Sequence, residues 1–247
     1  AIGRALGRGP RMPRKLVAAR SAHGADIART LKLPEAVAQA IAALDEHWDG
    51  SGQPLGLAGK AIPVGARIAL IVQTADVFHA SGGPDLARRE IRKRKGSALD
   101  PELCDAFLKL SAGTRFWDDA NAADIETRVV ALEPEGPFVL VDENYLDEIA
   151  AAFGQVIDAK SPFTAGHSAR VGWLCDEVAA ELGYESEQRR ALRRAAMLHD
   201  VGKLGVSSTI IEKPGKLDGA EWRTMQAHAA RTTEILGRIA AISDMAL

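Results

Sequence analysis

Three histidines, an aspartate and a lysine toward the C-terminal end of the sequence have the types and spacing of a metal centre. His199 and Asp200 are adjacent at the end of an apolar stretch with helical spacing, and Lys203 follows them within one turn. An imidazole nitrogen and a carboxylate oxygen together suit a divalent transition metal. His167 lies on the preceding helical segment and His228 on the following one. Because helical bundles build such centres from successive helices, we expect these side chains to converge.

The expected centre has the chemistry to act on phosphate esters. Asp200 could bridge two metal ions, which polarise a phosphate and lower the pKa of a bound water. Lys203 could add a positive charge that holds the substrate phosphate. We therefore assign catalytic roles to Asp200 and Lys203, with Lys203 also binding substrate.

Each of these residues also has an ordinary structural explanation. His167 could cap the start of a helix, His228 could be a half-buried helix residue, and Lys203 could stabilise a helix C-terminus. A His-Asp pair by itself is weak evidence for a metal site. The pair gains weight from the Val-Gly-Lys that follows it and from a later Lys-Pro-Gly-Lys-Leu run.

The segments that must position these residues are predicted to be helices, and the predicted fold class is all-α. Ser186 is the expected N-cap of one helix, and Asp218 with Glu221 has the pattern of a capping box that starts another. In the first half, residues 66–78 could form a buried helix or a strand, and their length favours a helix. Helical spacing of apolar residues is clearest over 145–158, 165–182 and 186–203.

Composition narrows the class of protein. The 247 residues are 47% hydrophobic and 26% charged with a formal net charge of -2, which excludes a mostly disordered chain and a strongly basic nucleic-acid-binding surface. We find no run of about 18 apolar residues that would form a membrane-spanning helix. Cys104 and Cys175 are far apart and match no CxxC pattern, as is typical of a reducing compartment. We expect a cytoplasmic protein whose present segment binds neither nucleic acid nor membrane.

Three sequence blocks occur in order: SPFTAGHSARV, HDVGKLGV and IIEKPGKLDGAEWRTMQAH. Together they resemble the HD-GYP subgroup of the HD phosphohydrolase superfamily over roughly residues 143–247. The resemblance implies an all-helical domain with two or three ions of iron, manganese or a similar metal, cyclic di-GMP as the best-known substrate, and phosphate contact by Lys203. Some members have an extra carboxylate ligand where this sequence has Phe163, so we expect two ions. The implied metal ligands are His167, His199, Asp200 and His228.

A related block in the first half departs from the family pattern. Residues 45–78 keep many glycines and prolines of the second block of the signature. Leu44 and Asp45 stand where its paired histidines belong, and Gln53 stands where its tyrosine belongs. Glu46 keeps the acidic position. The block therefore resembles the second half of a degenerate HD-like domain, and its glycine-rich loop is better explained as a structural remnant than as a phosphate cradle.

The order of the blocks predicts three parts. Residues 1–112 are the C-terminal part of a degenerate HD-GYP-like domain, 113–142 are a linker with room for a short β-hairpin, and 143–247 are the N-terminal metal-binding part of an HD-GYP domain. This order is similar to that of tandem-HD bacterial regulators. The first residue is not Met, and Leu247 precedes the expected second block. We therefore expect a fragment of a longer protein.

The leading functional prediction is a metal-dependent phosphodiesterase of the HD-GYP type that hydrolyses cyclic di-GMP in bacterial signalling. The alternative is a non-catalytic HD-fold sensor or scaffold module of a transcriptional regulator, which the missing second histidine pair favours. A third hypothesis, in which the first-half loop completes the second-half site, conflicts with Leu44, because leucine cannot bind a metal. The expected partners are a cyclic dinucleotide substrate and a second copy of the chain in a homodimer.

Overall fold

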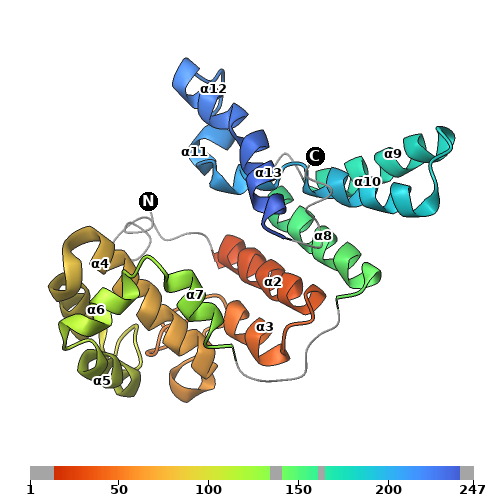
Figure 1. Ribbon diagram of the computed structural model, residues 1–247. Helices are drawn as coiled ribbons and strands as arrows, with labels where there is room; N and C mark the ends of the chain where they lie inside the picture. Colours follow the sequence, from red (N-terminus) through yellow and green to blue (C-terminus); the bar gives the residue numbers. More distant parts are fainter. Residues whose placement is uncertain (1–13, 134–140, 161–164, 240–247) are drawn as a thin grey trace. The chain divides into compact units, whose positions relative to one another are not determined.

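In the computed structural model, the regular secondary-structure elements of the described residues are all helices (Figure 1). The chain divides into two compact units, Ala1–Phe138 and Val139–Leu247. Within the described ranges, the one β-type pairing is an isolated bridge between Lys95 and Leu99. The all-α prediction is therefore confirmed, and none of the described helices has both the length and the apolarity to cross a lipid bilayer. The described residues are 14–133, 141–160 and 165–239.

The first unit buries its main core between α4, α5 and α6. Ile71 of α4 packs with Cys104 and Phe107 of α5 and with Trp117 of α6. Asp100 caps α5 by accepting hydrogen bonds from the first backbone N–H groups of the helix, as Asp does at this position. The described helices of this unit are α2 (Arg14–Thr30), α3 (Glu35–Ala42), η1 (Gly59–Ala61), α4 (Val64–Arg94), α5 (Pro101–Leu110), α6 (Thr114–Ala120) and α7 (Ile125–Val130).

Residues 66–78 lie within α4, as their length favours. The β-branched Ile71 and Thr74 are buried there, so packing outweighs their weaker helix propensity. The backbone leaves helical geometry at Gly82 and Gly83, and Pro84 follows. The helix therefore bends before its basic C-terminal half.

The predicted linker, residues 113–142, contains the two helices α6 and α7, so the expected β-hairpin is wrong for its described part. The reason is packing, since Trp117 is buried against the core of the first unit. Its indole N–H donates to the carbonyl of Ser111 at 3.1 Å, and its ring stacks on His79 with centroids 4.6 Å apart. Residues 134–140 lie outside the described part of the chain.

The second unit packs α8, α9 and α10 against one another (Figure 1). The short helix η2 contacts both α8 and α13. Leu146 and Ile157 of α8 share an apolar core with Leu198, Val201 and Leu236. Residues 199 and 200 are therefore flanked by two buried side chains, Leu198 and Val201. The described helices are α8 (Glu143–Asp158), α9 (His167–Glu181), α10 (Ser186–Leu198), η2 (Val201–Gly205), α11 (Ser208–Ile211), α12 (Gly219–Gln226) and α13 (His228–Gly237).

Capping boxes set the starts of two helices in this unit, α10 and α12. Asp218 and Glu221 form the predicted box at the start of α12. At α10 the prediction of Ser186 as N-cap is wrong, because Glu185 caps the helix and exchanges hydrogen bonds with Gln188. A carboxylate followed three residues later by a Gln side chain satisfies two free N–H groups at once, which displaces the serine into the first turn.

Candidate metal centre

Helix ends bring the residues singled out from the sequence next to one another. His167 is the first residue of α9, His199 directly follows α10, and His228 is the first residue of α13. Asp200 precedes η2 and Lys203 lies within it. The structure therefore places three imidazoles and a lysine around one carboxylate.

The two oxygens of Asp200 face different neighbours. Its Oδ2 lies 3.2 Å from Nε2 of His199, 4.0 Å from Nε2 of His167 and 2.5 Å from Nζ of Lys203. Its Oδ1 lies 3.4 Å from Nε2 of His228. One atom each from His167, His199 and Asp200 lie within 4.8 Å of one another, as ligands of a common ion would. His228 is outside this group and faces the other oxygen, Oδ1.

Backbone carbonyls fix the orientation of two of the imidazoles. Nδ1 of His199 lies 2.7 Å from the carbonyl oxygen of Ala196, and Nδ1 of His228 lies 2.6 Å from that of Met225. A carbonyl only accepts, so each Nδ1 carries the proton and donates it. In the metal-binding form of either ring the lone pair is on Nε2, the atom that faces Asp200. Metal-binding histidines in proteins are commonly held in this way.

Neighbouring donor groups keep Asp200 ionised although it is buried. The residue is only 3% exposed, and burial alone would raise the pKa of its carboxyl group. Hydrogen bonds from Nε2–H of the protonated His199 ring and from Lys203 outweigh burial and lower that pKa well below its ordinary value. The same contact with Asp200 raises the pKa of His199. The carboxylate is therefore available as an anionic ligand at neutral pH.

A buried pair that the sequence analysis missed supports the start of α9. The carboxylate of Asp158 accepts a hydrogen bond from Oγ of Ser168 at 2.8 Å and faces the backbone N–H of that residue at 3.2 Å. Both residues are at least 90% buried, so the pair holds the residue next to His167. The SPFTAGHS block contained the signal, since a hydroxyl directly after the histidine can anchor the helix start. The aspartate lies outside that block.

The related loop of the first unit is held differently. Glu46, 2% exposed, accepts backbone N–H groups from Leu55 at 2.5 Å, Gly56 at 3.1 Å and Leu57 at 3.0 Å. Asp45, which stands at a histidine position of the family pattern, pairs with Arg20 at the surface. Both carboxylates therefore bind groups of the first unit itself, as expected of a structural remnant.

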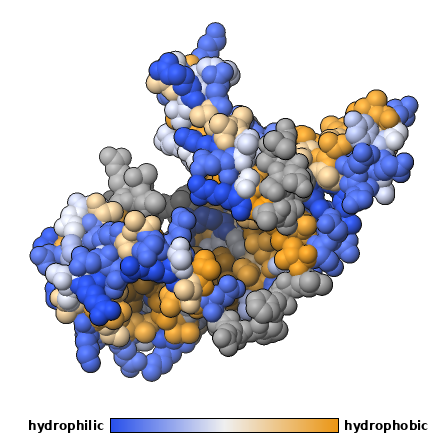
Figure 2. Space-filling model, in the orientation of Figure 1, coloured by the Kyte–Doolittle hydropathy of each residue, from blue (hydrophilic) through white to orange (hydrophobic). Residues whose placement is uncertain are grey.

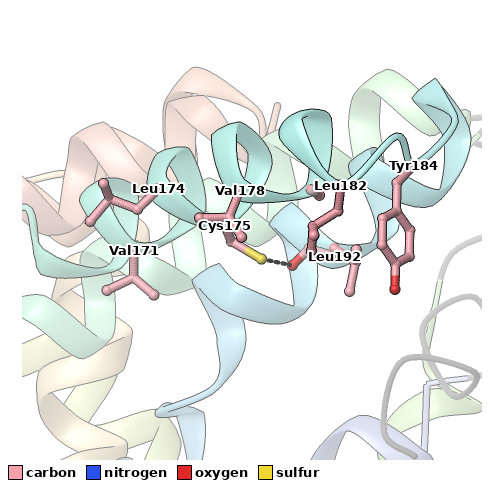
Figure 3. Close-up of a pocket in the computed structure, with 8 residues that line it drawn as sticks. Val171, Leu174, Cys175, Val178, Leu182, Tyr184 and Leu192 are labelled. Atoms are coloured by element: carbon pink, nitrogen blue, oxygen red, sulfur yellow. Dashed lines mark hydrogen bonds between the residues drawn. The ribbon is translucent and has the colours of Figure 1, made fainter.

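A separate apolar groove lies between α9 and α10, with a volume of about 390 Å³ (Figure 3). Leu174, Val178 and Leu182 line it and are more than half exposed, and Figure 2 shows the resulting apolar surface along α9. Its polar contact is a long one, from Sγ of Cys175 to the carbonyl of Leu192 at 3.7 Å. None of the histidines lines this groove, so it lacks the donor set for metal or phosphate chemistry.

Comparison with known proteins decides the family. A family model described as HD domain matches residues 10–103 and again residues 152–247. This chain belongs to the HD domain family. The match spans both units, including the first-unit loop that lacks the paired histidines. The residues around Asp200 lie within the second match, so the candidate metal centre lies in an HD domain.

Several relatives of this HD-domain protein are curated phosphodiesterases. It is 47% identical over 232 residues to 3'3'-cGAMP-specific phosphodiesterase 3 of Vibrio cholerae, which covers 94% of this chain and 50% of the relative. It is 33% identical over 96 residues to the cyclic di-GMP phosphodiesterase of Thermotoga maritima, over 39% of this chain and 26% of the relative. The HD-domain chain thus spans at most about half the length of these relatives.

A crystal structure of a cyclic GMP-AMP-specific phosphodiesterase of V. cholerae has the same fold. Its TM-score with this HD-domain protein is 0.72 at 47% sequence identity, over 94% of this chain and 57% of that one. The likeness therefore includes both units and supports the HD-type arrangement of helices around Asp200.

Proposed function

We propose that this chain carries the metal-binding part of a phosphodiesterase that hydrolyses a cyclic dinucleotide. The observation that carries the proposal is the convergence of three imidazole Nε2 atoms on the two oxygens of one buried carboxylate, Asp200. The names of its relatives supply the reaction class.

The residues present fit a divalent metal. His167, His199 and His228 would supply nitrogen ligands and Asp200 oxygen ligands, a mixed set that suits iron or manganese. A metal bound there supplies Lewis-acid polarisation of a phosphate ester. The chain contributes fixed ring orientations and an ionised carboxylate. Lys203, partly exposed beside Asp200, contributes a cation that can hold a phosphate oxygen.

Two ions are the proposed stoichiometry. Oδ2 of Asp200 faces His167 and His199, whereas Oδ1 faces His228, so each oxygen has its own imidazole neighbours. A carboxylate in this arrangement can bridge two ions. Phe163, where an extra carboxylate would favour a third, lies outside the described residues.

The proposed substrate is 3'3'-cGAMP rather than the cyclic di-GMP expected from the sequence. The relative named for 3'3'-cGAMP matches 94% of the chain at 47% identity. The Thermotoga relative named for cyclic di-GMP matches 39% of the chain at 33% identity. Substrate preference depends on many contacts around the metal, so the longer and closer match carries more weight.

The double match to the family model also supports the proposed organisation of the chain. Residues 1–112 would be part of a degenerate domain and residues 143–247 the metal-binding part of a second one. The contrast between Glu46, bound to its own loop, and Asp200, surrounded by histidines, agrees with this assignment.

The test is metal content together with hydrolysis. The purified chain, loaded with Mn²⁺ or anaerobically with Fe²⁺, should bind two ions, and the His199→Ala, Asp200→Ala double variant should bind none while keeping its helical circular dichroism. The matched control is His47→Ala in the first unit, which should bind metal normally. Unchanged metal content in the double variant would overturn the site.

Hydrolysis distinguishes the enzyme from its rival, a non-catalytic sensor or scaffold. The metal-loaded chain is incubated with 3'3'-cGAMP or cyclic di-GMP, and the products are separated by chromatography. Faster hydrolysis of 3'3'-cGAMP supports the proposal. Binding of metal and dinucleotide without any turnover, both by this chain and by a longer form that includes the expected second block, would favour the rival. Faster turnover of cyclic di-GMP would overturn the substrate assignment.

A further inference from the structure

Thr232 makes a different contact from the other threonines of its region. The hydroxyl groups of Thr224 and Thr233 each donate to the carbonyl four residues earlier, as threonines in helices commonly do. The hydroxyl of Thr232 instead donates to the carbonyl of His199, 33 residues away, at 3.0 Å. It therefore joins α13 to the segment that carries the candidate metal ligands.

The same hydroxyl also accepts a hydrogen bond. The backbone N–H of Gly202 donates to Oγ1 of Thr232 at 3.0 Å. Thr232 thus contacts the residue before Asp200 and the residue two positions after it, and it is 9% exposed. One buried side chain therefore holds both flanks of the carboxylate that the histidines surround.

A glycine brings the two segments into contact. A Cβ atom at Gly202 would lie 1.9 Å from the carbonyl oxygen of His228 and 2.7 Å from the backbone nitrogen of Thr232. The backbone of η2 consequently touches the backbone of α13 at the turn that carries His228. Because His228 and Thr232 are four residues apart, they lie on the same face of α13.

We propose that Thr232 is a positioning residue that sets the geometry of the metal centre by fixing Asp200 relative to His228. This inference rests on the proposed function, because it assumes that these residues hold a metal. Removing the hydroxyl would leave the part-buried His199 carbonyl and the buried Gly202 N–H without this partner. The segment around Asp200 could then move relative to α13, and the ligands would be spaced less well for an ion.

The test uses Co²⁺ as the probe, because its visible absorption reports coordination geometry without any turnover. Thr232→Val keeps the shape of the side chain but removes the hydroxyl. We expect it to weaken Co²⁺ binding by roughly 10- to 100-fold, as loss of a hydrogen bond behind a metal ligand does, and to alter the absorption bands. Thr232→Ser should restore both. Thr233→Val, which removes a hydroxyl that bonds within its own helix, is the matched control and should leave both unchanged.

Stability is measured on the metal-free variants, so that a loss of fold is not mistaken for a loss of metal. If valine prevents folding, Thr232→Cys replaces it, because a thiol is a weak donor of similar size. Wild-type affinity and absorption bands in the folded variant would overturn the inference alone. Failure of the unmodified chain to bind Co²⁺ would overturn the proposed function and the inference together.

Discussion

Glu46 in the first unit and Asp200 in the second are both buried carboxylates in HD-type segments, yet they have opposite kinds of partner. Glu46 accepts three backbone N–H groups from the loop that follows it. Asp200 is surrounded by three imidazoles and the ammonium group of Lys203. The carboxylate at Glu46 is used to hold a loop, whereas the one at Asp200 faces groups that can share a metal.

The difference teaches that burial of a charge does not by itself identify a functional site. A buried carboxylate must find partners in any protein, since an unpaired buried charge is too unfavourable to keep. What separates the two sites is whether those partners are backbone donors, which only stabilise the anion, or imidazoles with a free lone pair. A substitution that removes the charge should therefore have different consequences in the two units.

The largest expected effect is the loss of metal from Asp200→Asn. The amide keeps the size of the side chain but removes the negative charge of the carboxylate that the three histidines surround. We expect a loss of affinity beyond the roughly 10- to 100-fold that follows from losing a supporting hydrogen bond. Isothermal titration with Mn²⁺ measures it.

Glu46→Gln is the matched change in the first unit. One carboxylate oxygen becomes an NH₂ group, which donates and cannot accept from the backbone N–H groups that face it. The substitution should therefore lower the free energy of unfolding by about 1–3 kcal/mol. Its Mn²⁺ binding should equal that of the unmodified chain. Loss of Mn²⁺ binding in Glu46→Gln would break the distinction between the two carboxylates.

The next effect is steric and involves one glycine in each unit. A Cβ atom at Gly52 would lie 2.1 Å from the backbone nitrogen of His47, and one at Gly202 would lie 1.9 Å from the carbonyl oxygen of His228. Backbone atoms must move in both cases. Each alanine substitution should therefore lower the free energy of unfolding by more than the roughly 1–3 kcal/mol typical of overpacking. Gly202→Ala should also impair Mn²⁺ binding, and Gly52→Ala should not. Urea unfolding and Mn²⁺ titration of the same samples separate the two outcomes, and equal Mn²⁺ affinities would contradict the comparison.

Much of the fold, and the residues that gather around Asp200, could be predicted, because local patterns encode them. Helical spacing and the capping box at Asp218 and Glu221 are properties of neighbouring residues, and the structure has them where expected. The helix at Trp117 was not predicted, because its stability comes from a distant core in the first unit.

The arrangement of the candidate centre likewise depends on contacts between residues that are distant in the sequence. The chain order places His167, His199 and His228 on different segments, but only the structure shows which oxygen of Asp200 each one faces. The role of Thr232 was missed because its partners are about 30 residues away and are backbone atoms, which have no signature in the sequence.

A smaller effect concerns the ion pair between Arg67 and Asp100 in the first unit, with Nη1 and Oδ2 2.7 Å apart. Burial alone would raise the pKa of Asp100, but the hydrogen bond from Arg67 and two backbone N–H groups outweigh it and lower that pKa. Arg67→Met leaves a buried carboxylate without its cation. We expect a loss of about 3 kcal/mol at pH 7, the low end for a broken buried pair, because Arg67 is partly exposed.

The pH dependence of this loss has a definite sign. A carboxyl group whose pKa is lower in the folded state contributes stability above its unfolded pKa, about 3.9, and loses it as the pH falls further. The difference between wild type and Arg67→Met in urea unfolding should therefore be greatest near pH 7 and shrink below about pH 4. A difference that grows in acid would show that the ion pair is not its source. Mn²⁺ binding at pH 7 should be unaffected.

The smallest expected effect is at His47, a histidine that is next to Glu46 in the sequence but outside the candidate centre. Its Nδ1 lies 3.1 Å from Oγ of Ser51 within the same loop. His47→Gln keeps a polar group within reach of Ser51, so the free energy of unfolding should change by less than about 0.5 kcal/mol. Mn²⁺ affinity should stay the same, whereas His199→Gln should lose most of it. If the two variants lost metal equally, a histidine of the first unit would belong to the centre, and the contrast between the units would no longer hold.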